Sequence, residues 1–163
     1  MNPIRQKATL LPDVDESVGA AAVLAVEAAG EVYGFPLSVV REILIPPPIT
    51  DVPRSDDRVL GVITVRGQII TVLDLPTLLG IGVAQDQAYG RVLLVDNGEE
   101  LVGVAVSRVI HVYRLNQDRI EYANAMNAEL SDYVVGVGRV VVDPAAGTEE
   151  MLVLIDPMTL LRS

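Results

Sequence analysis

Apolar and polar positions alternate in short blocks along the chain, and the clearest block spans residues 59–79. Two apolar runs, Val59–Val65 and Ile69–Leu73, flank the polar break Arg66-Gly67-Gln68. A short polar break with a central glycine between β-branched runs is typical of a β-hairpin. This block therefore predicts two antiparallel strands joined by a tight turn.

A short helix is expected directly after that hairpin. Asp74 precedes an apolar segment that contains Pro76 and ends before Gly80. Aspartate is a favoured N-cap, proline fits the first helical turn, and glycine commonly follows the last one. The predicted unit is thus strand, tight turn, strand and one-turn helix.

The same unit recurs near the C-terminus. The run VLIDPMTLL at 153–161 aligns without a gap with TVLDLPTLL at 71–79, and VVGV at 134–137 echoes VLGV at 59–62. In the second copy, a polar loop at 143–150 replaces the tight turn. Two related halves, each too small for a large core of its own, are expected to pack together.

Apolar runs before the first unit predict further short elements. Val18–Val26 and Val32–Leu37 are expected to form a strand pair, although the alanine content leaves a helix open for the first run. Ser38–Leu44 carries apolar residues at helical spacing with its serine as a candidate cap, which predicts a short helix.

The segments after the first unit also favour strands. Asn97-Gly98 lies between the apolar runs Val92–Val95 and Glu100–Val106, which predicts a hairpin with a type I′ turn. Val109–Leu115 continues as a strand, and Asn116–Ser131 is expected to be a long surface connection. Many short strands separated by turn signals favour an all-β barrel or sandwich, and the repeat makes it two small barrels packed on each other.

Composition fits one domain or two small subdomains that share a core. The 163 residues are half hydrophobic, which is enough to bury a sizeable interior. Residues 1–17 lack a regular apolar period, so a flexible N-terminal tail is expected before a folded region at 18–163. With no cysteine and one histidine, His111, the chain offers no thiolate or multi-histidine metal site, and no cofactor is expected.

The formal net charge of −10 disfavours two classes of partner. A nucleic-acid binder needs a clustered basic surface, and an anionic membrane attracts basic segments. The apolar stretch Val18–Val26 stops at Glu27, short of the about 20 residues that a membrane span needs. Acidic residues separate it from Arg5 and Lys7, unlike the continuous start of a signal peptide. We expect a cytoplasmic protein.

The carboxylates do not suggest an enzyme. Asp56 and Asp57 are sequence neighbours in a polar loop, where side chains seldom converge on one substrate. Asp74 and Asp156 hold equivalent capping positions of the repeat, which accounts for them without catalysis. No triad, phosphate-binding glycine loop or metal cluster is recognisable, so we predict a protein without catalytic activity.

Four motifs, in order along the chain, resemble the CheW-like family. The run PITDVPRSDDRVLGVITVRGQIITVLDL resembles the family's loop, strand, Asn-Leu-Arg-Gly turn and second strand. VVREIL, LVGVAVSRVIHVYRL and MLVLIDPMTLL resemble its Val-x-Glu-Ile segment, its Val-Gly strand pair and its closing helix. The resemblance covers about Val18 to Leu161, but Thr64-Val65 replaces Asn-Leu and Ser107 replaces an aspartate. These departures leave the fold unaffected and put specific partner contacts in doubt.

The resemblance implies both a fold and a function. The family's fold is two five-stranded SH3-like barrels around a shared hydrophobic core. Its members are adaptors that couple methyl-accepting chemoreceptors, at their signalling tips, to the regulatory domain of a CheA-like histidine kinase. For this chain, the net charge leads us to expect neither nucleic-acid binding nor direct membrane contact. A divergent member in a non-flagellar pathway, such as pilus motility or gene regulation, and a small-molecule-binding β-barrel are the alternatives.

The resemblance also implies a partner-binding site. Its expected residues are Val40, Glu42, Gly61, Arg66 and Gly67. We predict that Arg66 pairs with Glu42 and so steadies the segment beside the hairpin. The two glycines are also accounted for by backbone geometry alone.

The apolar residues next to Glu42 leave two interpretations open. Val39, Val40 and Ile43 are either core residues or apolar contacts that face a receptor. Apolar positions at helical spacing normally face inward, which favours the core.

Overall fold

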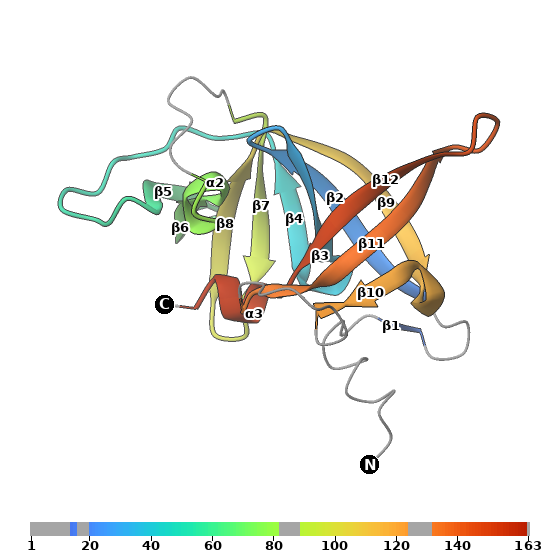
Figure 1. Cartoon of the computed structure of the whole chain (residues 1–163). Helices are drawn as coiled ribbons and strands as arrows, with labels where there is room; N and C mark the ends of the chain where they lie inside the picture. Colours follow the sequence, from blue (N-terminus) through green and yellow to red (C-terminus); the bar gives the residue numbers. More distant parts are fainter. Residues whose placement is uncertain (1–13, 16–19, 82–88, 124–131, 163) are drawn as a thin grey trace, which may run out of the picture.

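The fold was analysed in a computed structural model that describes residues 14–15, 20–81, 89–123 and 132–162, and it consists mostly of strands in two sheets (Figure 1). The strands are β1 (Val14–Asp15), β2 (Ala20–Ala28), β3 (Glu31–Pro36), β4 (Val40–Leu44), β5 (Val59–Val65), β6 (Gln68–Asp74), β7 (Arg91–Asp96), β8 (Leu101–Val106), β9 (Arg108–Asn116), β10 (Ile120–Tyr122), β11 (Val134–Asp143) and β12 (Thr148–Ile155). The helices are the 3₁₀ turns η1 (Leu37–Val39) and η2 (Gln117–Arg119) and the one-turn helices α2 (Leu75–Leu78) and α3 (Pro157–Leu160).

Barrel 1 is the five-stranded sheet, in the order β4-β7-β8-β6-β5. The chain beyond β4 closes it: Thr50 exchanges two backbone hydrogen bonds, of 2.9 and 2.8 Å, with Val62 of β5 at the opposite edge. Pro46, Pro47 and Pro48 separate β4 from this bridge, and proline favours such an extended, non-helical path.

Barrel 2 has the same plan, built from chain segments on both sides of barrel 1. β2, β3, β12, β11 and β10 follow one another in the second sheet, and β9 pairs with the free side of β2. The turn η2 joins β9, which pairs with β2, to β10, which pairs with β11. This bent segment closes barrel 2, just as the segment from β4 to Thr50 closes barrel 1. The N-terminal hairpin therefore belongs with the C-terminal half of the chain.

The predicted repeat is present in the strand register. Both hairpins, β5–β6 and β11–β12, are irregular at the same place, before Gly61 and before Gly136. In both barrels the second strand of the hairpin then pairs in parallel with a glycine: Val72 lies opposite Gly103, and Leu154 lies opposite Gly34. The repeat thus preserves pairing as well as sequence.

Three apolar clusters fill the interior. One lies inside each barrel, and the largest joins the two barrels. This shared cluster contains Phe35 from β3, Leu93 from β7 and Leu160 from α3. The expected all-β fold of two small five-stranded barrels around a common core is confirmed.

Two local predictions were wrong. Ser38–Leu44 is not a helix: η1 is followed by β4, because pairing with β7 outweighs the helical spacing of the apolar residues. The Asn97-Gly98 hairpin forms, but not as a type I′ turn. Asn97 accepts hydrogen bonds on its side-chain oxygen from the backbone N–H groups of Glu99 and Glu100, which builds a longer loop.

Three other segments also differ from the predictions. Within the expected tail, Val14–Asp15 forms β1 and pairs with β2, and most of the remaining tail lies outside the described residues. The expected connection at 116–131 contains β10, and residues 124–131 lie outside the described part. The loop of the second hairpin is shorter than expected, because β11 ends at Asp143 and β12 begins at Thr148.

Candidate partner-binding site

The turn between β5 and β6 projects Arg66 from the edge of barrel 1. Arg66 has φ 50° and Gly67 has φ 81°, which is the pattern of a two-residue type I′ turn. The left-handed conformation is unfavourable for a residue with a Cβ atom, and Asn, Asp or Gly usually occupies it. Arg66 nevertheless adopts it, as Ala29 does before Gly30 in the β2–β3 turn.

Arg66 pairs with Glu42, as predicted. Its Nη2 lies 2.5 Å from Oε1 of Glu42, and its Nη1 lies 3.4 Å from Oε2, so the contact is bidentate. The pair connects the β5–β6 turn to β4. β4 and β5 are the two edge strands of barrel 1, and they do not pair directly with each other in the sheet. Arg66 remains 72% exposed and Glu42 35% exposed, so the pair is fixed in geometry yet open to a partner.

The ion pair shifts both ionisations. The hydrogen bond from Arg66 lowers the pKa of the Glu42 carboxyl, and the same hydrogen bond raises the pKa of the Arg66 guanidinium. Because the folded pKa of Glu42 is depressed, the pair's stabilising contribution is present above the ordinary carboxylate range. It is lost as the pH falls through the lowered pKa of Glu42.

Gly61 has a structural explanation. It is buried with φ +150°, and a Cβ atom there would lie 2.2 Å from the carbonyl oxygen of Thr50 and 2.8 Å from Cγ2 of Ile49. Only glycine allows the closing segment of barrel 1 to come this near. Gly67, by contrast, lies in open space, where its positive φ suits the turn.

The apolar residues around the ion pair divide into core and surface. Val39 is buried and Val40 packs half-buried against the shared core, whereas Ile43 is 41% exposed. Ile45, just beyond β4, and Ile69, next to the β5–β6 turn, are 78% and 72% exposed. The core interpretation therefore holds for Val39 and Val40, while Ile43 is available for contact.

Sequence reasoning missed the two exposed isoleucines. Within β6, Ile70 and Val72 face the interior, so the period of two places Ile69 on the outer face. That alternation was readable from the sequence. Ile45 carried no comparable signal, because the path after β4 depends on the barrel closure.

A groove lies beside the outer face of β4. It has a volume of about 300 Å³ and is lined by Ile43, Gly90, Arg91, Arg108 and Val109. Arg108 is held by an ion pair of 2.6 Å with Glu27. A short segment of a partner could place apolar side chains here, next to two arginines.

The candidate catalytic residues have structural contacts. Asp74 caps α2, accepts from the backbone N–H of Thr77 at 3.2 Å and accepts from Tyr89 Oη at 2.6 Å. Burial and this hydrogen bond raise the pKa of Tyr89. Asp156 caps α3 and accepts from the backbone N–H of Met158 at 3.1 Å. These contacts match the capping roles that the repeat predicted.

The other titratable candidates lie apart from one another. Asp56 forms an ion pair with Arg58 in the loop before β5, and the hydrogen bond from Arg58 lowers the pKa of Asp56. His111 is exposed on β9 and contacts Tyr113 edge-on, with ring centroids 4.9 Å apart. Among the described residues, no three His, Asp or Glu side chains are placed to hold a metal ion together.

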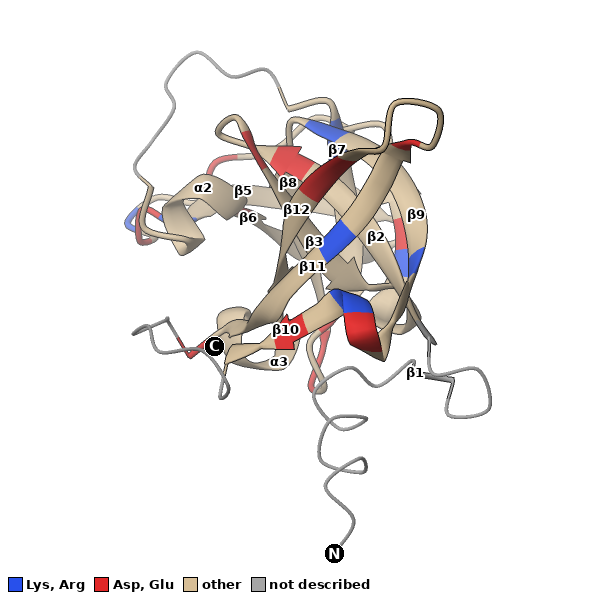
Figure 2. Ribbon diagram, turned by 45° about the vertical axis from the view of Figure 1, so that its right-hand side comes forward, with Lys and Arg blue, Asp and Glu red and all other residues tan. Residues whose placement is uncertain are grey.

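The charged residues are not concentrated on any one strand or helix of the described chain. Figure 2 shows the arginines spread over separate strands and turns of the described chain, with acidic residues between them. In the part that the structure describes, no helix is long and apolar enough to cross a membrane.

Two equivalent barrels with a shared core, and an exposed ion pair on a hairpin edge, define a double β-barrel domain. The chain belongs to the CheW-like domain family, whose sequence model matches residues 22–163. This family consists of adaptor and scaffold proteins of chemotaxis-type signalling.

Individual comparisons agree with this assignment. The chain is 31% identical to the chemotaxis protein CheW of Klebsiella aerogenes, over 82% of this chain and 76% of that protein. It is 28% identical to protein PilI of Pseudomonas aeruginosa, over 82% of this chain and 75% of that protein. Alignments cover from 59% to 76% of the length of five curated relatives.

The fold also matches a solved structure. The scaffolding protein TtCheW of Thermoanaerobacter tengcongensis superposes with a TM-score of 0.74, covering 88% of this chain and 93% of that one. At 24% sequence identity, this likeness concerns the fold alone.

Proposed function

We propose that this protein is a non-catalytic adaptor that couples chemoreceptors to a CheA-type histidine kinase. In this proposal it acts in the cytoplasm, binding the receptor's signalling tip and the kinase's regulatory domain at once. Receptor state then reaches the kinase as a coupling free energy, typically ~1–3 kcal/mol between linked sites.

The observation that carries the proposal is the Arg66–Glu42 pair. It is preorganised, since its two residues come from different edges of barrel 1 and meet in bidentate geometry. It is also accessible and lies near exposed apolar residues, Ile45 and Ile69. Apolar anchors next to a defined charge pair are the usual ingredients of a protein-binding surface.

The partner-binding residues are part of the proposal. Val40 and Glu42 lie on β4, whereas Arg66 and Gly67 form the turn that meets it. Gly61 contributes indirectly, because its buried position lets Thr50 hold the edge of barrel 1 in place. We therefore assign contact to Glu42 and Arg66 and support of the surface to Gly61.

The test is a charge-reversal cycle measured by calorimetry. Purified kinase regulatory domain and receptor signalling tip are titrated separately with wild type, Arg66→Glu, Glu42→Arg and the double variant. We expect each single reversal to weaken binding of at least one partner about tenfold, and the double variant to recover part of the loss.

A matched control comes from barrel 2. Arg119 and Glu149 form a surface ion pair there, with side chains 41% and 39% exposed, so Arg119→Glu should leave both titrations unchanged. Unaltered binding by Arg66→Glu, or an equal loss with Arg119→Glu, would refute the assignment of the site. Failure of wild type to bind either partner would refute the adaptor proposal itself.

A pilus-type pathway is the second candidate. It is favoured by the match to PilI, which extends over as much of this chain as the match to a CheW protein. Parallel titrations against the kinase regulatory domains of a flagellar and a pilus system separate the two. Tighter binding to one of the two kinase domains identifies the pathway in which the protein acts.

We also propose that residues 18–163 act as one folded unit. The chain passes from barrel 2 to barrel 1 and back, and the two barrels share the cluster around Phe35 and Leu93. If one barrel unfolded alone, this apolar cluster would be exposed to water. Separate unfolding of the barrels is therefore unfavourable. A single calorimetric transition is the expected result.

A further inference from the structure

A second groove lies where α3 meets barrel 1, lined by residues that the proposed adaptor function does not use. It has a volume of about 280 Å³. Its lining residues come from β5 and the residue before it, β6, α2, β8 and the residue before it, and the C-terminal segment: Arg58, Val59, Thr71, Leu73, Leu78, Glu100, Val102, Leu160, Leu161 and Arg162. No residue of the Arg66–Glu42 surface is among them.

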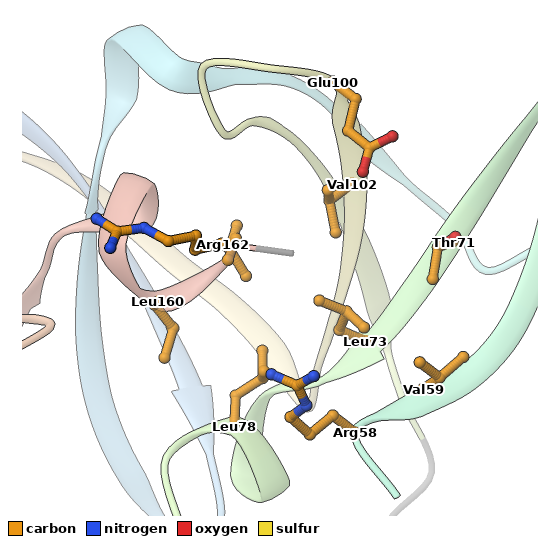
Figure 3. A pocket seen from close by; sticks show the side chains of 10 residues that line it. Arg58, Val59, Thr71, Leu73, Leu78, Glu100, Val102, Leu160 and Arg162 are labelled. Carbon is orange, nitrogen blue, oxygen red and sulfur yellow. The ribbon is translucent and has the colours of Figure 1, made fainter. Parts of the chain in front are cut away.

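The floor of the groove is apolar and comes from both copies of the repeat. Leu78 of α2 and Leu160 of α3 occupy matching positions in the two units. Leu73 and Val102 complete the floor from barrel 1. Figure 3 shows the side chains of Leu73, Leu78 and Leu160 converging on the middle of the groove.

The walls are held in place by hydrogen bonds. The buried Asn97 donates from Nδ2 to the carbonyl oxygen of Leu161 at 2.8 Å, which fastens the C-terminal wall to the β7–β8 loop. On the other side, the carbonyl oxygen of Arg58 accepts from the backbone N–H of Asp74 at 2.8 Å. A pocket with fixed walls loses little freedom when it binds a ligand.

Basic and acidic side chains lie at different places on the rim of the groove. Arg58 donates from Nε and Nη2 to Asp56, which orients its guanidinium, while its Nη1 has no acceptor among the described residues. Arg162 lines the groove from the α3 side and has no ion pair within the described part of the chain. Glu100 stands at the far end from Arg58 in Figure 3.

We propose that this groove binds an acidic-apolar segment of a partner protein. One or two leucine-like side chains would fill the floor, and a neighbouring aspartate or glutamate would pair with Arg58, away from Glu100. A second acidic residue would approach Arg162, whose guanidinium lies on the opposite side of the groove in Figure 3. The size is compatible with a short segment, because about 280 Å³ is just below the usual range for small-ligand pockets. Charge complementarity favours it as well, since guanidinium groups recognise carboxylates in a planar fork.

The test uses a fluorescein-labelled peptide, Gly-Glu-Leu-Leu-Glu-Gly, and its Gln-for-Glu counterpart. Fluorescence anisotropy is measured with the full chain and with Arg58→Gln, Arg162→Gln and Glu100→Gln. We expect each arginine substitution to weaken the acidic peptide about 3–10-fold and Glu100→Gln to strengthen it about 2–3-fold, since rim charges are only partly screened. Arg114→Gln, an exposed arginine outside the groove, is the matched control and should change nothing.

Methyl NMR places the peptide independently. The expected shifts are confined to Leu73, Leu78, Val102 and Leu160. Equal affinity for the neutral peptide, or shifts at other methyl groups, would overturn the proposal. Binding of octanoate at these methyl groups without binding of the peptide would overturn it in favour of a small amphiphilic anion. The test does not involve the kinase or the receptor, so its failure leaves the adaptor proposal intact.

Discussion

Replacing Gly61 by alanine should open the edge of barrel 1. The added Cβ would lie 2.2 Å from the carbonyl oxygen of Thr50, which is backbone and cannot rotate away. The closing segment must therefore move, and the two hydrogen bonds between Thr50 and Val62 would be weakened or lost. Alanine would in addition have to adopt φ +150°.

The expected cost follows from these two terms. Losing two backbone hydrogen bonds costs about 2 kcal/mol in net terms, at about 1 kcal/mol each. Holding a non-glycine residue in a glycine-only conformation costs about 1–3 kcal/mol. We expect Gly61→Ala to lower the free energy of unfolding by roughly 3–5 kcal/mol.

Urea denaturation followed by circular dichroism measures this effect, with two comparison variants. Gly67→Ala carries only the backbone penalty of about 1–2 kcal/mol, because its Cβ would enter open space. Gly136→Ala carries the close-approach cost without the penalty for positive φ, since a Cβ there would lie 2.3 Å from the carbonyl oxygen of Glu121. A Gly61→Ala loss no larger than that of Gly67→Ala would refute the close-approach argument.

Three further predictions concern other contacts. Arg66→Gln should raise the pKa of Glu42 toward its ordinary value, as read by NMR titration of the carboxyl carbon; an unchanged pKa would contradict the ion pair. Phe35→Ala should cost about 3–5 kcal/mol and make amides of both barrels exchange through one common unfolding event; independent exchange of the barrels would contradict a shared core. Asn97→Asp, which removes the donor to Leu161, should cost about 1–3 kcal/mol in urea denaturation, and full stability would show that the bond contributes nothing.

The local parts of the fold could be predicted from the sequence. The β5–β6 hairpin, the aspartate caps and the repeat depend on turn glycines and short-range spacing, which a sequence displays directly. The closure of barrel 1 by Thr50 could not be predicted, because it depends on pairing between distant segments. Ser38–Leu44 was misassigned because its apolar residues are spaced as in a helix, whereas pairing with the distant strand β7 makes 40–44 a strand.

The candidate site shows the same division. The pairing of Arg66 with Glu42 was expected from the family resemblance, since no spacing rule connects residues so far apart in sequence. Ile69 could have been placed on the surface from the alternation of β6. The groove beneath Arg58 had no sequence signal at all, because five separate segments meet to form it.

The central claim is that this protein joins a receptor to a kinase, and co-sedimentation tests it most directly. Membranes that carry the chemoreceptor are pelleted with purified CheA-type kinase, with and without this protein. The account predicts that the kinase enters the pellet only when wild-type protein is present, and less with Arg66→Glu than with Arg119→Glu. Kinase that stays in the supernatant, or receptor and kinase that displace each other from the protein, would contradict it.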